Sequence, residues 1–346
     1  MPVSDADMVR AWTHVLSLSK LQPKQTVTIL TSQNTNPQTL STARIAAGNM
    51  GAIVNRLDLP PVNAEFAHSR DSLAYLGTTP LTDNDAAIAA LKKSDIVLDL
   101  MTLLFSPEQA EILEGGTKIL LAVEPPEVLV RLLPSLEDKT RVGQAAAMLA
   151  AAKEMRVTSK AGTDLRLPLG EFPVIQEYGF VDEPGRWDHW PSGFGLTFPN
   201  ERQASGRVVL DRGDILLPMK SYLNTCIEMT VDKGYVTSIT GEVDADLLND
   251  YMASFDDKEA YAVSHIGWGQ QRRARWSTLG LYDREETIGM DARAFAGNFL
   301  FSMGPNNEAG GSRHTACHID IPMRNCTVLL DNREVVREGK LLEDAA

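Results

Sequence analysis

The sequence predicts an α/β protein in two parts: an N-terminal domain built on a doubly wound parallel sheet, then a β-rich α+β C-terminal domain. Three observations carry this prediction. Strand and helix patterns alternate through residues 26–123, an Ala-rich helical pattern covers 140–155, and short strand patterns rich in Gly, Pro and Trp follow. We therefore expect a boundary near residue 155, with domains at 1–155 and 156–346.

The N-terminal half begins with an amphipathic helix over residues 8–19. Buried strands are then predicted at 26–30, 52–57, 95–100 and 118–123, with helices at 36–50 and 83–93. Pro37 suits the first turn of its helix, where a missing N–H costs nothing. Parallel sheets of this kind bind ligands beyond the carboxyl ends of their strands. No G-x-G-x-x-G or Walker loop follows these strands, so the sequence gives no support to a nucleotide site.

The C-terminal half has a different texture. Strand patterns occur at 208–210 and 235–239, and residues 244–255 have a helical pattern. The segment 326–336 predicts a hairpin on an Asp-Asn turn. This half is therefore expected to be built mainly from antiparallel strands.

Composition excludes several classes of partner. The 346 residues carry a formal net charge of −13, which argues against nucleic acid and anionic membranes, since both require a basic face. No run of eighteen apolar residues occurs, and the polar N-terminus does not resemble a signal peptide. The three cysteines have no C-x-x-C spacing, so we expect a cytoplasmic protein without disulfides or a cysteine zinc site.

The candidate chemistry centres on an H-x-D string, His318-Ile319-Asp320, with His265 about fifty residues upstream. On an extended segment, side chains two residues apart point to the same face, so His318 and Asp320 can hold one divalent metal together. Adding His265 gives the 2-His-1-carboxylate set typical of non-haem Fe(II) oxygenases. The alternative is a buried Asp–His hydrogen bond, because a buried carboxylate needs a partner.

The remaining histidines receive different interpretations. His14 and His68 are expected to be surface or capping residues. His314 is expected to lie at the surface or to support a metal ligand without binding the metal itself. His189, in an aromatic-flanked loop, is a candidate general acid/base, with a stacked structural histidine as the alternative. Glu177 is a candidate acid/base or orienting group for the same chemistry.

Polar residues near a Gly-rich loop are candidates for substrate binding. They precede the loop 304–308 and can hydrogen-bond a polar ligand: Arg293, Asn298 and Ser302.

Three segments resemble the metallo-aminopeptidases of the leucyl aminopeptidase T type: 190–199 (WPSGFGLTFP), 266–269 (IGWG) and 297–320. The departures are informative. The resemblance implies two metal-binding glutamates and a histidine. This chain has Phe194 in place of the first glutamate, His265 in place of the second, and Leu300 in place of the histidine. A two-metal peptidase needs bridging carboxylates, so the retained set, His265, His318 and Asp320, favours one metal.

This altered pattern is similar to the 2,5-dihydroxypyridine 5,6-dioxygenase family, on the same scaffold. The resemblance implies an enzyme that uses Fe(II) and O2 for an extradiol-type opening of a small aromatic N-heterocycle. The product would be N-formylmaleamate, in nicotinate or nicotine breakdown. The resemblance also implies a homo-oligomer, and a histidine where this chain has Phe105, a predicted substrate contact. Our hypothesis for this reaction is that His189 deprotonates a ring oxygen. A residual metallo-aminopeptidase and a catalytically impaired ligand-binding protein remain alternatives.

Overall fold

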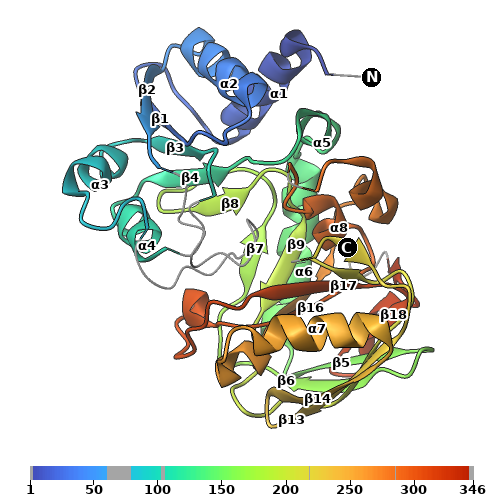
Figure 1. The fold of residues 1–346 in the computed structure, drawn as a ribbon. Coiled ribbons are helices and arrows are strands. Elements are labelled where there is room, and N and C mark those ends of the chain that lie inside the picture. Colours follow the sequence, from blue (N-terminus) through green and yellow to red (C-terminus); the bar gives the residue numbers. More distant parts are fainter. Residues whose placement is uncertain (1–2, 61–78, 103–105, 218, 285, 343–346) are drawn as a thin grey trace. The chain divides into compact units, whose positions relative to one another are not determined.

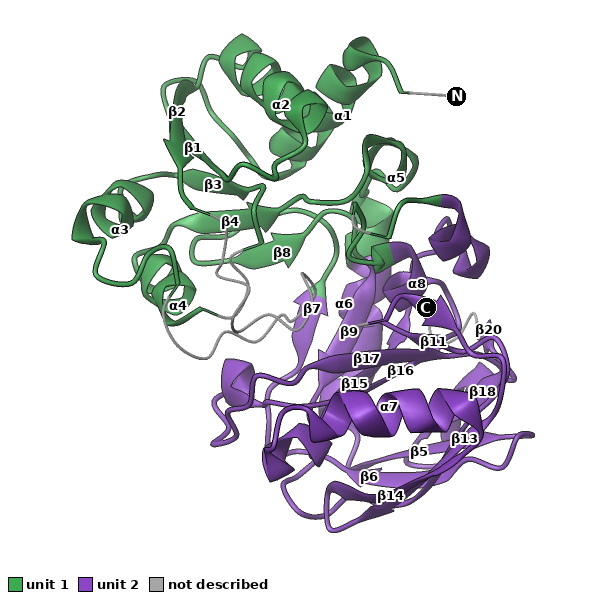
Figure 2. Ribbon diagram, viewed as in Figure 1, with its two compact units in different colours: residues 1–139, 177–192, 282–290 green, residues 140–176, 193–281, 291–346 purple. Residues whose placement is uncertain are grey.

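The computed structural model describes residues 3–60, 79–102, 106–217, 219–284 and 286–342 (Figure 1). The chain forms two compact units: unit 1 is Met1–Lys139, Glu177–Ser192 and Tyr282–Met290, and unit 2 is Thr140–Gln176, Gly193–Leu281 and Asp291–Ala346 (Figure 2). The sequence predicts a single boundary near residue 155. In the structure the chain first leaves unit 1 sixteen residues earlier and later returns to it twice, because the segment Glu177–Ser192 supplies a strand to the sheet of unit 1.

Unit 1 contains a five-stranded parallel sheet in the order β2-β1-β3-β4-β8. Its strands are β1 (Thr26–Thr31), β2 (Ile53–Asp58), β3 (Ile96–Asp99), β4 (Lys118–Leu121) and β8 (Trp187–His189). Its helices are α1 (Asp5–Leu18), α2 (Pro37–Asn49), α3 (Asp85–Lys92), α4 (Pro107–Glu114) and α5 (Pro126–Arg131). Helix α1 contacts α2 and α5, whereas α3 contacts α4, so the helices form two groups. The doubly wound parallel sheet is confirmed.

The ends of these elements follow from local chemistry. The Asn36 side chain accepts hydrogen bonds from two backbone N–H groups at the start of α2, with Pro37 in the first turn as predicted. Strand β8 was not predicted, because three residues are too few to show a strand pattern.

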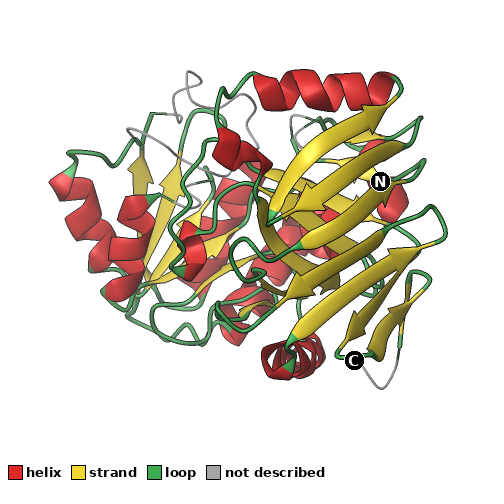
Figure 3. Cartoon of the chain, turned by 90° about the horizontal axis from the view of Figure 1, so that it is seen from below, coloured by secondary structure: helices red, strands yellow, loops and turns green. Residues whose placement is uncertain are grey.

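Unit 2 is built from two antiparallel sheets (Figure 3). The larger has the order β14-β13-β10-β6-β5-β18-β19-β20, and the smaller has the order β17-β16-β15-β9-β7. The larger comprises β5 (Glu154–Ser159), β6 (Asp164–Pro168), β10 (Ser205–Leu210), β13 (Ile227–Asp232), β14 (Tyr235–Gly241), β18 (Cys326–Leu330), β19 (Arg333–Arg337) and β20 (Lys340–Leu341). The smaller comprises β7 (Ile175–Glu177), β9 (Phe194–Thr197), β15 (Val263–Gly269), β16 (Phe299–Met303) and β17 (Ile319–Met323).

Other elements lie wholly or mainly in this unit: α6 (Leu136–Ala151), α7 (Val243–Ala253), α8 (Met290–Ala294), and the short pair β11 (Ile215–Leu216) and β12 (Ser221–Tyr222). The described part of the chain also contains the 3₁₀ turns η1 (Lys258–Tyr261), η2 (Trp276–Leu281) and η3 (Asn307–Ala309). The predicted helix at 244–255 and the predicted hairpin at 326–336 are both confirmed. Within the described ranges, no helix is long and apolar enough to cross a bilayer.

The core of unit 2 fixes the direction of the side chains on the smaller sheet. Alternate residues of its strands join one apolar cluster with residues of the larger sheet, among them Ile266, Phe301 and Ile321. Because strand side chains alternate between faces, the residues between them point to the opposite face of the smaller sheet. That face carries His265, Ser302 and Asp320.

Candidate metal centre

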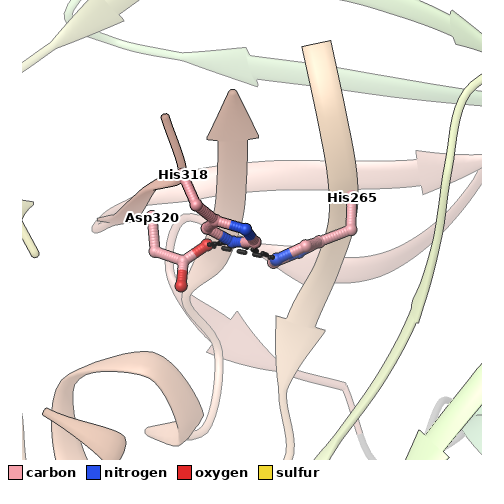
Figure 4. Close-up of side chains that lie close together, drawn as sticks. All are labelled: His265, His318 and Asp320. Atoms are coloured by element: carbon pink, nitrogen blue, oxygen red, sulfur yellow. Dashed lines mark hydrogen bonds and ion pairs between the residues drawn. The ribbon is translucent and has the colours of Figure 1, made fainter. Parts of the chain in front are cut away.

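Three side chains converge on that face of the smaller sheet: His265 from β15, Asp320 from β17, and His318 from the residue before β17 (Figure 4). The two Nε2 atoms are 3.0 Å apart, and each lies 3.2 Å from Asp320 Oδ1. All three residues are buried. Among the described residues, no other group of three or more His, Cys, Asp or Glu side chains is close enough to hold a metal.

The distances suit ligands of one ion. Two donors bound side by side to one metal at bonds of about 2.1 Å are about 3.0 Å apart. The structure thus brings together the three residues predicted as ligands, including the same-face placement of His318 and Asp320 expected from strand geometry. The donor set fits one divalent metal with open positions.

Strand register produces this convergence. In the pairing of β16 with β17, Ser302 is directly opposite Asp320. In the pairing of β15 with β16, the register shifts between Val263 and Ile266, so two residues of β15 face one residue of β16. Such a bulge redirects a side chain. The bulged residues of β15 include His265.

The electrostatics favour the metal-binding forms of two of the three candidate ligands, Asp320 and His318. Burial alone would raise the pKa of Asp320, but the neighbouring charges of His318, Arg293 and His265 hold that pKa well below its usual value. Burial lowers the pKa of His318, against the opposing charge of Asp320. Burial would also lower the pKa of His265, but the negative charge of Asp320 raises it. Metal binding requires an ionised carboxylate and neutral imidazoles, which Asp320 and His318 already supply.

The residues predicted to bind substrate lie beside this cluster. Arg293 Nε donates to Asp320 Oδ2 at 2.6 Å, and Ser302 Oγ donates to Asp320 Oδ1 at 2.5 Å. Both carboxylate oxygens are therefore held by protein groups. Arg293 and Ser302 are buried, and both hold the carboxylate of Asp320, a candidate metal ligand.

Asn298 is also buried, and its side chain bonds to the backbone. Oδ1 accepts from Gly269 N at 2.6 Å, and Nδ2 donates to the carbonyl oxygens of Ala292 at 3.3 Å and Arg293 at 2.7 Å. These bonds hold the Asn298 amide against the backbone, and its contact with a substrate stays a prediction. Phe105, the fourth residue predicted to contact substrate, lies outside the described residues.

The predicted acid/base pair lies in unit 1. His189 is at the carboxyl end of β8, not in a loop as the sequence predicts, because Leu121 of β4 pairs with it in parallel. Its Nε2 lies 3.9 Å from Glu177 Oε2, and Ser192 Oγ donates to the same oxygen at 3.3 Å. Both partners are buried. This strand end is the edge of a parallel sheet at which ligand-binding groups usually gather.

The backbone around His189 is held by Asp188. Its Oδ1 accepts from His189 N at 2.8 Å, and its Oδ2 accepts from Tyr178 N at 2.9 Å and Arg186 Nη2 at 2.6 Å. The Trp187 ring meets the His189 ring edge-on, with centroids 4.5 Å apart. These contacts fix the position of the imidazole.

One charged residue near the metal centre was missed by the sequence analysis. Glu308, in η3, has a pKa raised to about 7, with loss of hydration as the main cause; the charge of His265 opposes this shift and that of Asp320 adds to it. The sequence feature that could have indicated its role is its position in the Gly-rich loop, ten residues before His318. His314, in the same loop, is exposed and does not belong to the cluster.

Comparison with known proteins identifies the family. A sequence model described as 2,5-dihydroxypyridine 5,6-dioxygenase matches residues 7–343. The chain belongs to the 2,5-dihydroxypyridine 5,6-dioxygenase family. A curated member from Pseudomonas putida KT2440 is 52% identical over 342 residues, which cover 99% of this chain and 98% of that protein. The resemblance inferred from the motifs is confirmed.

Solved structures agree with this assignment. The 2,5-dihydroxypyridine dioxygenase of Pseudomonas putida KT2440 matches the fold with a TM-score of 0.97 at 51% identity, covering 100% of both chains. AmpT from Thermus thermophilus matches with a TM-score of 0.63 at 15% identity, covering 97% of this chain and 99% of that one. The second likeness shows a shared fold and supports the predicted aminopeptidase-like scaffold of this dioxygenase family.

Proposed function

We propose that this protein is an Fe(II)-dependent, extradiol-type dioxygenase that opens the ring of 2,5-dihydroxypyridine with O2 to give N-formylmaleamate, in nicotinate or nicotine breakdown. Family membership over nearly the whole chain supports the substrate and the reaction class. The observation that carries the metal assignment is the convergence of two imidazole nitrogens and one carboxylate oxygen within 3.2 Å of one another.

In this proposal His265, His318 and Asp320 hold the iron. When bound, the metal would supply open positions for the electron-rich ring and O2. Arg293 keeps Asp320 anionic through the bond to Oδ2, which leaves Oδ1 directed at the two histidines. Asp320 thereby offers one oxygen, not two, to the metal.

We assign proton transfer to His189 and Glu177 on the chemistry of the pair. A histidine whose ordinary pKa is near neutrality suits the removal of a proton from a ring hydroxyl. Glu177 Oε2, at 3.9 Å from Nε2, would stabilise the imidazolium that forms. We also propose a cytoplasmic homo-oligomer; its three cysteines are free thiols, as a reducing compartment requires.

The aminopeptidase-like alternative has weaker support. The likeness to AmpT is at 15% identity and concerns the fold. A hydrolytic two-metal centre needs bridging carboxylates, and the cluster in the described part of the chain contains one.

The test is O2 uptake after 2,5-dihydroxypyridine is added to anaerobically Fe(II)-loaded protein, with metal-free protein as the control. The proposal expects iron-dependent uptake and a mass-identified ring-opened product. Peptide hydrolysis by Zn(II)-loaded protein, with no O2 uptake, would favour the hydrolase. If iron binds and neither reaction occurs, Phe105→His distinguishes the remaining cases: restored uptake indicates an impaired dioxygenase, and continued inactivity contradicts the proposed reaction.

A further inference from the structure

Three polar side chains form a row across three adjacent strands. His265 is on β15, Ser302 is on the neighbouring β16, and Asp320 is on β17, directly opposite Ser302. Ser302 is therefore the middle residue of the row and is fully buried. Its Oγ lies 3.1 Å from His265 Nδ1 and 2.5 Å from Asp320 Oδ1. One hydroxyl thus contacts two of the three candidate ligands.

The number of hydrogens decides the direction of both bonds. A serine hydroxyl has one hydrogen to donate and lone pairs to accept with, whereas a carboxylate can only accept. The hydrogen of Ser302 therefore goes to Asp320 Oδ1. The contact with His265 then requires that Nδ1 carries a hydrogen and donates it to Oγ. A neutral imidazole protonated on Nδ1 has its lone pair on Nε2, the nitrogen that faces His318 and Asp320.

We propose that Ser302 is a positioning residue that holds His265 in the Nδ1-protonated tautomer and so prepares the centre for its metal. The inference rests on the proposed metal site, but it requires neither O2 nor substrate. It replaces the predicted role of Ser302 in substrate binding, because its single hydrogen is already donated to Asp320.

The competing arrangement shows why this bond matters. Without the hydroxyl, a buried Nδ1–H at His265 would lose its acceptor, which is unfavourable. The other tautomer places the hydrogen on Nε2, which is 3.2 Å from Asp320 Oδ1 and can donate to it. That hydrogen would occupy the space between two candidate ligands. A metal would then have to displace it, so binding would weaken; loss of such supporting hydrogen bonds costs about 10–100-fold in metal affinity.

The chain offers a matched control in Ser264. It is next to His265, is equally buried, and donates its hydroxyl to the carbonyl oxygen of Pro305. Ser264→Ala removes a hydroxyl of the same kind beside the same ligand but leaves the row intact. Ser302→Thr keeps the hydroxyl and serves as the conservative rescue.

The experiment uses the full chain with Zn(II) or Co(II) alone. Ser302→Ala should weaken metal binding about 10–100-fold, whereas Ser264→Ala should change it by less than about threefold and Ser302→Thr should restore most of the affinity. In metal-free protein at an alkaline pH that leaves His265 neutral, ¹⁵N NMR of labelled histidines, assigned with His265→Gln, should show the Nδ1–H tautomer of His265 in the wild type and the Nε2–H tautomer in Ser302→Ala.

Wild-type metal affinity together with an unchanged His265 tautomer in Ser302→Ala would overturn the proposal, as would equal losses in Ser302→Ala and Ser264→Ala. If Ser302→Ala does not fold, Ser302→Cys, of similar volume and weaker hydrogen bonding, replaces it with the same expected direction. Because these measurements involve no turnover, a protein that binds metal but consumes no O2 would contradict the proposed function and still decide the role of Ser302.

Discussion

The candidate metal ligands of unit 2 and the candidate acid/base pair of unit 1 are held in different ways. The ligands come from neighbouring antiparallel strands, where register fixes their atoms within 3.2 Å of one another. His189 lies at the end of a parallel strand, with its Nε2 3.9 Å from Glu177 Oε2, beyond hydrogen-bond length. The first arrangement suits a site that must be rigid before a metal enters. The second places a buried carboxylate near an imidazole, the pairing that proton transfer uses, so substitutions should separate metal binding from proton transfer.

The largest effect is expected from removing a ligand. His318→Ala should reduce Fe(II) or Zn(II) affinity by more than about 100-fold and abolish O2 uptake, since three donors become two. Calorimetric titration measures the affinity. The matched control is His314→Ala, because His314 is exposed in the loop just before the same strand. Retention of stoichiometric metal by His318→Ala would remove it from the ligand set.

The next largest effect is expected from the pair in unit 1. His189→Gln should lower kcat by about 10²–10⁴-fold, the usual range for a general acid/base. Its metal affinity should match that of the wild type, because His189 is not in the metal-binding cluster. Steady-state O2 uptake and metal titration on the same samples make the comparison. Full turnover, or a loss of metal affinity that parallels the loss of kcat, would contradict the division of roles.

A stability effect is expected at Arg293. Arg293→Met leaves the buried carboxylate of Asp320 without its cationic partner, so metal-free protein should lose roughly 3–5 kcal/mol of unfolding free energy. Bound metal should recover part of this loss by supplying positive charge to Asp320. Urea denaturation with and without Zn(II) measures both quantities.

Arg337→Met is the control for that measurement. It breaks the ion pair of Arg337 with Glu334, in which the arginine is 64% exposed, and surface pairs contribute at most about 1 kcal/mol. Equal destabilisation by the two arginine substitutions, or no recovery with metal, would show that Arg293 does not act through the charge of Asp320.

The smallest effect is expected at Glu308 and depends on pH. Its pKa in the folded protein is about 7, above the ordinary value of 4.5, so the folded state binds the proton more tightly than the unfolded state. Ionisation of Glu308 therefore lowers stability as pH rises from about 4.5 through 7. Metal-free Glu308→Gln should have a higher Tm than the wild type at pH 8 and the same Tm at pH 4. A Tm difference that does not vary with pH would refute this, and exposed Glu114→Gln provides the baseline.

The sequence predicted what depends on local pattern. Period-two alternation placed His318 and Asp320 on one face, and the strand–helix alternation of residues 26–123 predicted the parallel sheet. The hydrogen bonds of Ser302 could not be predicted in this way. They depend on which residues of three distant strands are opposite one another, and on a bulge in β15 that shifts the pairing by one residue.

The division of the chain was difficult to predict for a related reason. Residues 177–192 return to unit 1 because β8 pairs with β4. Pairing between segments more than sixty residues apart is set by tertiary packing, and a three-residue strand shows no periodicity. The same limit applies to Glu308, because its raised pKa comes mainly from the protein that surrounds its carboxylate in the folded chain.

The most direct test of the central claim is anomalous diffraction at the iron edge from crystals of anaerobically Fe(II)-loaded protein. We predict one anomalous peak within bonding distance of His265 Nε2, His318 Nε2 and Asp320 Oδ1. A peak bound by other residues, or iron that binds in solution without a peak at these three atoms, would contradict the account.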